Sequence, residues 1–190
     1  LSGAEIYDPA AETWASGGSL IPARGFHTAT LLLSGRVLAV GGWNGSGYLA
    51  GAATFDPAGG GWTAAGVLTT GRGAHTATLL PGGKVLVVGG INAGVSLNSA
   101  EVYDPAGGTW KGAGVLTTAR NSHTATLLPT GEVLVTGGAQ NNAALAGAEV
   151  YDPATGMWTG VNPLSTARYN HTATLLPTGR VLAVGGVNAG

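Results

Sequence analysis

Cysteine is absent from the 190-residue sequence, which excludes disulfide bonds, thiolate nucleophiles and metal sites with cysteine ligands. Charge is also scarce: 9% of the residues are charged and the formal net charge is −1, so there is no polybasic surface for nucleic acid. No apolar run reaches the roughly 18 residues that a membrane helix needs. We therefore expect neither nucleic acid nor a membrane as a partner.

Motifs typical of catalysis are missing as well. The chain contains no Walker loop, no His-Glu-x-x-His, no Asp-rich calcium loop and no glycine-flanked serine nucleophile. We therefore expect no catalytic residue, no bound metal and no cofactor, and we expect that the protein is not an enzyme.

The sequence does contain an internal repeat whose period equals the spacing from Asp8 to Asp56. Asp8, Asp56, Asp104 and Asp152 are each followed by Pro-Ala and are evenly spaced, without insertion or deletion. A Trp, an Arg, a His that opens the hexapeptide HTATLL, and a Gly-Gly pair return at the same spacing. These repeated residues are Trp14, Trp62, Trp110 and Trp158; Arg24, Arg72, Arg120 and Arg168; His27, His75, His123 and His171; and the pairs that begin at Gly41, Gly89, Gly137 and Gly185.

Each unit is predicted to form four short strands. The segments HTATLL and VLVTGG are β-branched and apolar, and the turn sequence PTGE separates them. AEVYDP followed by GTW indicates a second hairpin, and no helical periodicity intervenes. Four antiparallel strands per unit predict an all-β fold made of β-propeller blades. We expect whole blades at about 23–66, 71–114 and 119–162, and one blade split between 167–190 and 1–18.

Arg-x-x-His, then Gly-x-Val-Leu-x-x-Gly-Gly, then Glu-x-Tyr-Asp and Trp make the chain similar to kelch repeats over essentially its whole length. The phrase HTATLLPTGRVL also resembles bacterial relatives of galactose oxidase. Their copper chemistry needs a Tyr–Cys cross-link, and this chain has no Cys. The resemblance to bacterial secreted kelch proteins implies an extracellular or periplasmic location.

Closure of the ring is left open by the sequence. A closed ring of four such blades would need a sharper rotation between neighbours than blades of this family make. Three alternatives follow: a homodimer that closes an eight-bladed ring, a fragment of a larger propeller, or a four-bladed ring of one chain.

The repeated His and Arg residues have two interpretations. Four histidines on the innermost strands could bind a metal or an anion in a central channel. We favour the alternative that the repeated His, Arg and Trp residues are structural and fasten one blade to the next. Glu5, Glu101 and Glu149 are the nearest acidic partners for the arginines, and because Ala53 interrupts this series, we expect Arg72 to have a different acceptor.

Function is sought where the units differ, in the loops after the second and the fourth strand, which should share one surface. The residues there are mainly amides and aromatics, which suit a protein partner or a neutral polar ligand such as a glycan. We predict a non-enzymatic scaffold for binding or assembly. The alternatives are a lectin-like propeller, the propeller part of a larger galactose-oxidase-like enzyme, and a designed or recently amplified repeat without a ligand. The candidate ligand-binding residues are Phe26, Trp43, Asn44, Tyr48, Asn92, Asn98, Asn121, Gln140, Asn141, Asn142, Tyr169 and Asn170.

Overall fold

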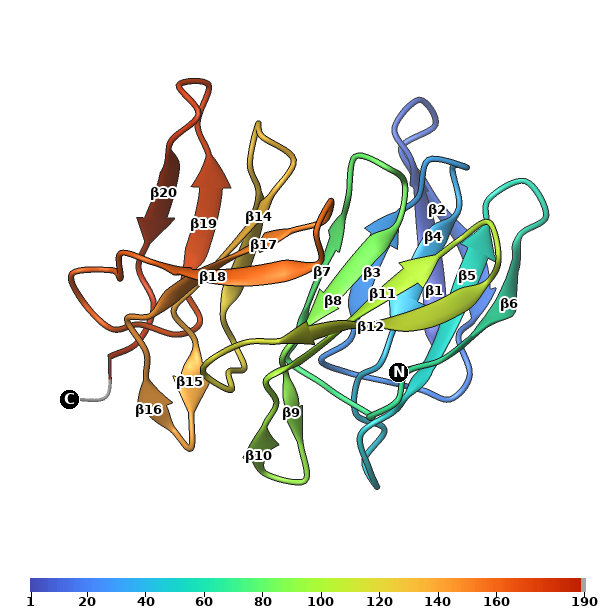
Figure 1. Cartoon of the computed structure of the whole chain (residues 1–190). Helices are drawn as coiled ribbons and strands as arrows, with labels where there is room; N and C mark the ends of the chain where they lie inside the picture. Colours follow the sequence, from blue (N-terminus) through green and yellow to red (C-terminus); the bar gives the residue numbers. More distant parts are fainter. Residues whose placement is uncertain (189–190) are drawn as a thin grey trace.

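The computed structural model describes residues 1–188, and every regular element in that range is a β-strand. Three four-stranded antiparallel sheets stand side by side in chain order (Figure 1). The first sheet contains β3 (Thr28–Leu31), β4 (Val37–Val40), β5 (Gly51–Asp56) and β6 (Gly61–Val67). The second contains β7 (Thr76–Leu79), β8 (Val85–Val88), β11 (Ser99–Asp104) and β12 (Thr109–Val115). The third contains β13 (Thr124–Leu127), β14 (Val133–Thr136), β17 (Ala148–Asp152) and β18 (Met157–Val161).

Each end of the chain forms a two-stranded half sheet. These are β1 (Gly3–Asp8) with β2 (Thr13–Ser19), and β19 (Thr172–Leu175) with β20 (Val181–Val184). Figure 1 shows them at opposite ends of the row of sheets, and no pairing between them occurs within residues 1–188. The two parts of the expected split blade are therefore present as separate halves, and closure of a ring by one chain is not detected within residues 1–188.

Two small hairpins project on the face opposite to the Pro/Gly turns (Figure 1). They are β9 (Ile91–Asn92) with β10 (Val95–Ser96), and β15 (Ala139–Gln140) with β16 (Ala143–Ala144). Their two-residue turns require left-handed backbone, with φ of 50° at Asn141 and 66° at Asn142 in the second hairpin. No helix in the described part of the chain is long and apolar enough to cross a membrane.

The hydrophobic core lies between successive sheets. Leu38 and Val40 of the first sheet pack with Val85, Val87 and Tyr103 of the second. The same cluster recurs between the second and the third sheet, one repeat further along the chain. Strand alternation explains the pattern, because every second side chain of β4 and β8 points to the same neighbour. No sheet is therefore covered on both faces without the sheet before it and the sheet after it.

The repeated tryptophans link neighbouring sheets by a hydrogen bond as well as by packing. Trp110 Nε1 donates to the carbonyl oxygen of Ala65 at 2.9 Å, and Trp158 Nε1 donates to that of Ala113 at 2.8 Å. In both cases the acceptor lies 45 residues earlier, in the outermost strand of the preceding sheet. Each indole thus partly buries its ring and satisfies its only donor in one contact.

The Gly-Gly pairs stand where successive units come closest. Gly89 has a φ of 58°, and a Cβ there would lie 2.5 Å from the carbonyl oxygen of Arg120 and 2.9 Å from His123 Cε1. The next glycine, Gly90, donates its N–H to that same Arg120 carbonyl at 2.8 Å. Only glycine combines this backbone conformation with this approach. The pair therefore fixes the spacing between one unit and the next.

Candidate binding face and the contacts that support it

The arginines that lead into the three complete sheets are buried and hold their own sheet together. Arg72 is fully buried and donates to the carbonyl oxygens of Gly89 at 2.8 Å and Ser99 at 3.0 Å. Its Nη2 also forms an ion pair of 3.0 Å with Glu101. Burial lowers the pKa of Arg72, while the Glu101 carboxylate acts in the opposite direction. Arg120 repeats the arrangement with Glu149 at 2.7 Å.

The expectation that Arg72 would need a different acceptor was wrong. Each of these two arginines pairs with the glutamate 29 residues later, in the third strand of its own sheet. The arginine that faces Ala53 by this spacing is Arg24, which donates to the carbonyl oxygens of Gly41 and Gly51, both at 2.9 Å. The error came from assigning Arg72 to the unit before it, because the arginine precedes the strands that it ties together.

The glutamates also join one sheet to the loop that leads into it. Glu101 accepts hydrogen bonds from the backbone N–H of Thr69 at 2.9 Å and from its hydroxyl at 3.1 Å. Glu149 accepts from the N–H of Thr117 at 2.8 Å. Each buried carboxylate therefore has both a charged partner and backbone donors, which compensates its loss of water.

The repeated histidines bridge successive units. His75 Nε2 lies 2.9 Å from the hydroxyl of Thr28 in the preceding innermost strand, and His123 Nε2 lies 3.0 Å from that of Thr76. Burial, reinforced by the neighbouring Arg72 and Arg120 charges, lowers the pKa of both His75 and His123 to about 3. Both rings are therefore neutral near pH 7, and the Nε2 atom of each is hydrogen-bonded to a threonine hydroxyl. Residues 1–188 contain no group of three or more His, Cys, Asp or Glu side chains that could hold a metal ion.

Above these contacts, the variable loops share a regular backbone. The residue directly before each repeated histidine has a φ between 50° and 54° although it is not glycine. These residues are Phe26, Ala74, Ser122 and Asn170. They are linked in series, since each of the last three donates its N–H to the carbonyl oxygen of the one before at 2.9–3.0 Å. The side chains that differ between units are thus displayed from a fixed track of backbone. We call this surface the loop face.

Three candidate residues converge at the first unit of the loop face. Phe26, Trp43 and Asn44 line a hollow of about 330 Å³ together with the backbone around Arg24. Phe26 is 70% exposed and Trp43 is 41% exposed. Backbone hydrogen bonds between Gly25 and Trp43, at 2.8 and 2.9 Å, hold the two loops side by side. Two large aromatic side chains therefore face solvent from loops that are themselves held in place.

Tyr48 belongs to the same aromatic group but is partly covered. It pairs with Trp43 across the short hairpin, and a Cβ on Gly73 would lie 3.1 Å from its ring. The same Cβ would lie 3.4 Å from Phe26 Cβ. Gly73, where the two following units carry Asn121 and Tyr169, thus leaves room for the Tyr48 ring beside Phe26.

Several candidate amides have structural partners. Asn44 Oδ1 accepts hydrogen bonds from the N–H groups of Ser46 and Gly47 at 3.0 and 2.9 Å, which makes it a turn former. The Asn121 amide donates to Ser96 Oγ at 2.9 Å and to the carbonyl oxygen of Ala139 at 3.1 Å. Asn141 and Asn142 form the β15–β16 turn. The structure places the other candidates on the same face but on separate units, namely Asn92, Asn98, Gln140, Tyr169 and Asn170.

Sequence reasoning missed Ser96, which is buried and braces two hairpins through Asn121 and the carbonyl oxygen of Ala139. The only signal was a polar residue where the other units have Tyr48 and Ala144.

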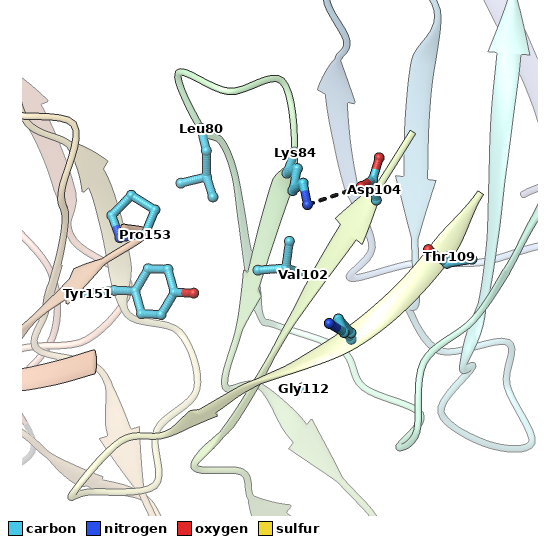
Figure 2. A pocket seen from close by; sticks show the side chains of 9 residues that line it. Leu80, Lys84, Val102, Asp104, Thr109, Gly112, Tyr151 and Pro153 are labelled. Atoms are coloured by element: carbon cyan, nitrogen blue, oxygen red, sulfur yellow. Dashed lines mark ion pairs between the residues drawn. The ribbon is translucent and has the colours of Figure 1, made fainter. Parts of the chain in front are cut away.

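A second hollow, of about 390 Å³, lies on the turn side between the second and the third sheet (Figure 2). The Lys84–Asp104 ion pair, 3.0 Å long, lies on one side and Tyr151 with Pro153 on the other. The preceding interface has the same elements, because Arg36 pairs with Asp56 at 2.9 Å and Tyr103 occupies the position of Tyr151. We assign this groove to the repeat packing, since it recurs with each unit.

The fold and its contacts define an all-β protein with repeated four-stranded antiparallel sheets, consistent with kelch blades. Comparison with protein families identifies a kelch motif in residues 72–113. These residues run from buried Arg72 through the second sheet to β12. No curated protein matches the chain.

The buried ion pairs should contribute far more to stability than the exposed ones. We expect Glu101→Ala to lower the free energy of unfolding by about 3 kcal/mol, because it leaves the Arg72 charge buried without its carboxylate. Lys84→Ala, which removes an exposed ion pair, should cause a much smaller loss. Urea unfolding of both variants checks this. Equal losses would mean that the Arg72–Glu101 pair has no special weight.

The buried histidines should make the fold sensitive to acid. His123 has a folded-state pKa of about 3, well below the roughly 6.5 expected when unfolded. As pH falls from about 6.5 toward 3, the unfolded chain takes up a proton that the folded chain refuses, so stability declines. We expect His123→Gln to flatten this decline, measured by urea unfolding across that range. Thr76→Val keeps the histidine and should retain the slope; an unchanged slope in His123→Gln would contradict the assignment.

Proposed function

We propose that this chain is a non-enzymatic binding scaffold whose loop face holds a protein or peptide partner, with Phe26 and Trp43 as the anchors. The observation that carries this proposal is the exposure of two large aromatic side chains beside a hollow of about 330 Å³. Aromatic residues set in such depressions dominate the binding energy of many interfaces. The kelch motif in residues 72–113 supports the general class of a binding scaffold.

The fixed backbone of the loop face supports the same function. Phe26 lies on the track of hydrogen-bonded residues, and Trp43 is held by two backbone hydrogen bonds to Gly25. A surface that is ordered before binding loses less conformational entropy when a partner arrives. Loop residues on a rigid scaffold are also where binding specificity can vary without changing the fold.

The chemistry of the face argues for a partner of low charge. Among the described residues that line the hollow, the only ionic side chain is that of Arg24, which is buried and donates to three backbone carbonyl oxygens. Exposed aromatic rings in such a hollow suit an apolar or aromatic side chain of a peptide. We therefore expect the preferred peptide to carry an aromatic or aliphatic residue at its centre.

A library of random displayed peptides, selected on the immobilised chain, tests this function. We expect enriched peptides whose affinity falls about tenfold or more in the Phe26→Ala/Trp43→Ala variant. Leu33→Ala is the matched control, because Leu33 is 74% exposed but lies in a turn on the opposite face. A loss of affinity equal in both variants, or selection of no peptide, would reject the proposal. Binding on a glycan array that depends on Trp43 would instead favour a lectin.

A further inference from the structure

The two half sheets expose residues whose counterparts in the complete sheets are mostly buried. Tyr7 in β1 is 46% exposed, whereas Tyr103 and Tyr151 at the equivalent positions are 4% and 5% exposed. In β20, Leu182 and Val184 are 49% and 52% exposed, whereas Leu38 and Val40 have no exposed surface. Strand edges with apolar faces of this kind are surfaces for pairing with another chain.

The edges of β1 and β20 match each other in register. In the complete sheets the second strand pairs with the third, with Val37 opposite Phe55 and Val40 opposite Ala52 in the first sheet. The second and the third sheet repeat this register at the equivalent positions of the following units. The next step of the series places Val181 opposite Tyr7, and Val184 opposite Ala4. β1 and β20 lie at opposite ends of the row of sheets (Figure 1), so the two matching edges do not pair within one copy.

Each end also has a hollow shaped for residues of the other end. A hollow of about 410 Å³ beside β1 is lined by Ile6, Val37 and Phe55. Between complete sheets, the equivalent space is filled by residues such as Leu38 and Val40. Their counterparts in β20 are Leu182 and Val184.

The hollow at the C-terminal end matches residues of the N-terminal half sheet. It measures about 350 Å³ and is lined by Leu134, Val161 and Leu164, among others. The residues that fill this position between complete sheets include Tyr103 with Trp110 in one interface and Tyr151 with Trp158 in the next. Their counterparts are Tyr7 and Trp14, which is 65% exposed.

Charges and hydrogen-bonding groups are complementary across the same edges. Glu5 is at the repeat position of Glu101 and Glu149, while Arg168 is at that of Arg72 and Arg120. Arg168 Nη1 already donates to the carbonyl oxygen of Gly185 at 2.7 Å, as the internal arginines do to their own Gly-Gly pairs. The missing element of the motif is a carboxylate, and Glu5 holds the repeat position that supplies it in the second and the third sheet.

Three further contacts follow from the same spacing. The Thr69–Glu101 bond predicts that the Ser165 N–H of one copy donates to Glu5 of the other. The Trp110–Ala65 bond predicts that Trp14 Nε1 donates to the carbonyl oxygen of Val161. The His75–Thr28 bond predicts a contact of His27 with Thr172.

The last Gly-Gly pair is consistent with an absent neighbour. A Cβ on Gly41, Gly89 or Gly137 would lie 2.5 Å from the arginine carbonyl oxygen of the following unit, whereas a Cβ on Gly185 would meet nothing within 4 Å. Gly185 nevertheless keeps a φ of 68°. Its backbone thus already has the shape that the internal pairs use to receive the next unit.

We propose that a second copy of this chain docks edge to edge, with β20 of one copy pairing with β1 of the other. Two copies are the smallest assembly in which both edges of every chain are covered. The two contacts are related by a twofold axis and produce a closed ring of eight sheets. The next step of the Phe26–Ala74 backbone series would also bring Asn170 of the second copy next to Phe26, at the border of the loop-face hollow. The mass and cross-linking experiments below test the assembly whatever that hollow binds.

The mass of the protein in solution tests whether a second copy covers the two edges. Sedimentation equilibrium of the unmodified chain should give twice its mass of 18.6 kDa. A monomer at all accessible concentrations would overturn the proposal. A series of larger polymers would overturn the closed ring and indicate open head-to-tail growth.

Disulfide trapping tests the register of β20 against β1. Because the natural sequence has no cysteine, only the introduced cysteines can form a cross-link. Gly41 donates to the Gly51 carbonyl, so the next pair along, Val40–Ala52, is of the non-hydrogen-bonded type in which side chains are closest. Its counterpart is Val184–Ala4. We expect Val184→Cys mixed with Ala4→Cys to form a cross-linked dimer on oxidation, while each variant alone does not. Ala183→Cys mixed with Ala4→Cys is the control, because residue 183 points to the other side of the sheet. No difference between the two mixtures would overturn the pairing.

Glu5→Gln tests the charge contact without touching the core of either copy. Glu5 lies on the free edge of β1, so the variant should fold normally and weaken the dimer about tenfold or more, since Arg168 loses its carboxylate. Glu12→Gln changes an exposed glutamate in the nearby β1–β2 turn and should leave the dissociation constant unchanged. Equal dissociation constants for the two variants would remove Glu5 from the interface.

Discussion

The close approach of the Gly-Gly pairs that begin at Gly41, Gly89 and Gly137 to the following unit is the constraint on which the rest of the structure depends. Because glycine has no Cβ, the carbonyl oxygen of the next arginine and the ring of the next histidine can both lie against its backbone. This contact sets the distance between sheets. At that distance the indole of each tryptophan reaches the preceding outer strand, and the histidine reaches the preceding threonine. Leu, Val and Tyr side chains then fill the remaining space. Each repeat unit therefore contributes one side of the interface with the unit before it and one side of the interface with the unit after it. Contacts with these neighbours explain its repeated residues.

The same constraint separates the scaffold from the surface that carries function. Arginine, glutamate and histidine, which would otherwise be natural candidates for chemistry, are buried and engaged with the backbone, with each other or with threonine. The loop face retains the freedom to vary, because its backbone follows the repeat while its side chains do not. Phe26 and Trp43 are the clearest result of that freedom, since other units place Ala74, Ser122 or Asn170 on the same track as Phe26.

The fold of each sheet could be predicted from the sequence because strand, turn and glycine signals agree within every unit. HTATLL, the Pro/Gly turn and the Asp-Pro turn all lie at the positions expected. The partner of each arginine was harder, because the repeat alone does not say whether Arg72 belongs with Ala53 or with Glu101; only the sheet topology decides. Asn141 and Asn142 form a turn in the structure, a role that asparagine often has, and their contact with a ligand stays a prediction. Closure of the ring could not be predicted, because it depends on the rotation between sheets, which side-chain volumes set.

The central claim is that every unit is fastened to the next by the same contacts, with the proposed second copy providing them for the last unit. Backbone hydrogen exchange measured at several protein concentrations tests it most directly. The N–H groups of Gly90 and Gly138, which donate to the carbonyl oxygens of Arg120 and Arg168, should be protected at every concentration. The N–H of Gly186, the next in the series, should gain protection as concentration rises and lose it on dilution. Exchange at Gly186 that does not change with concentration would contradict the account.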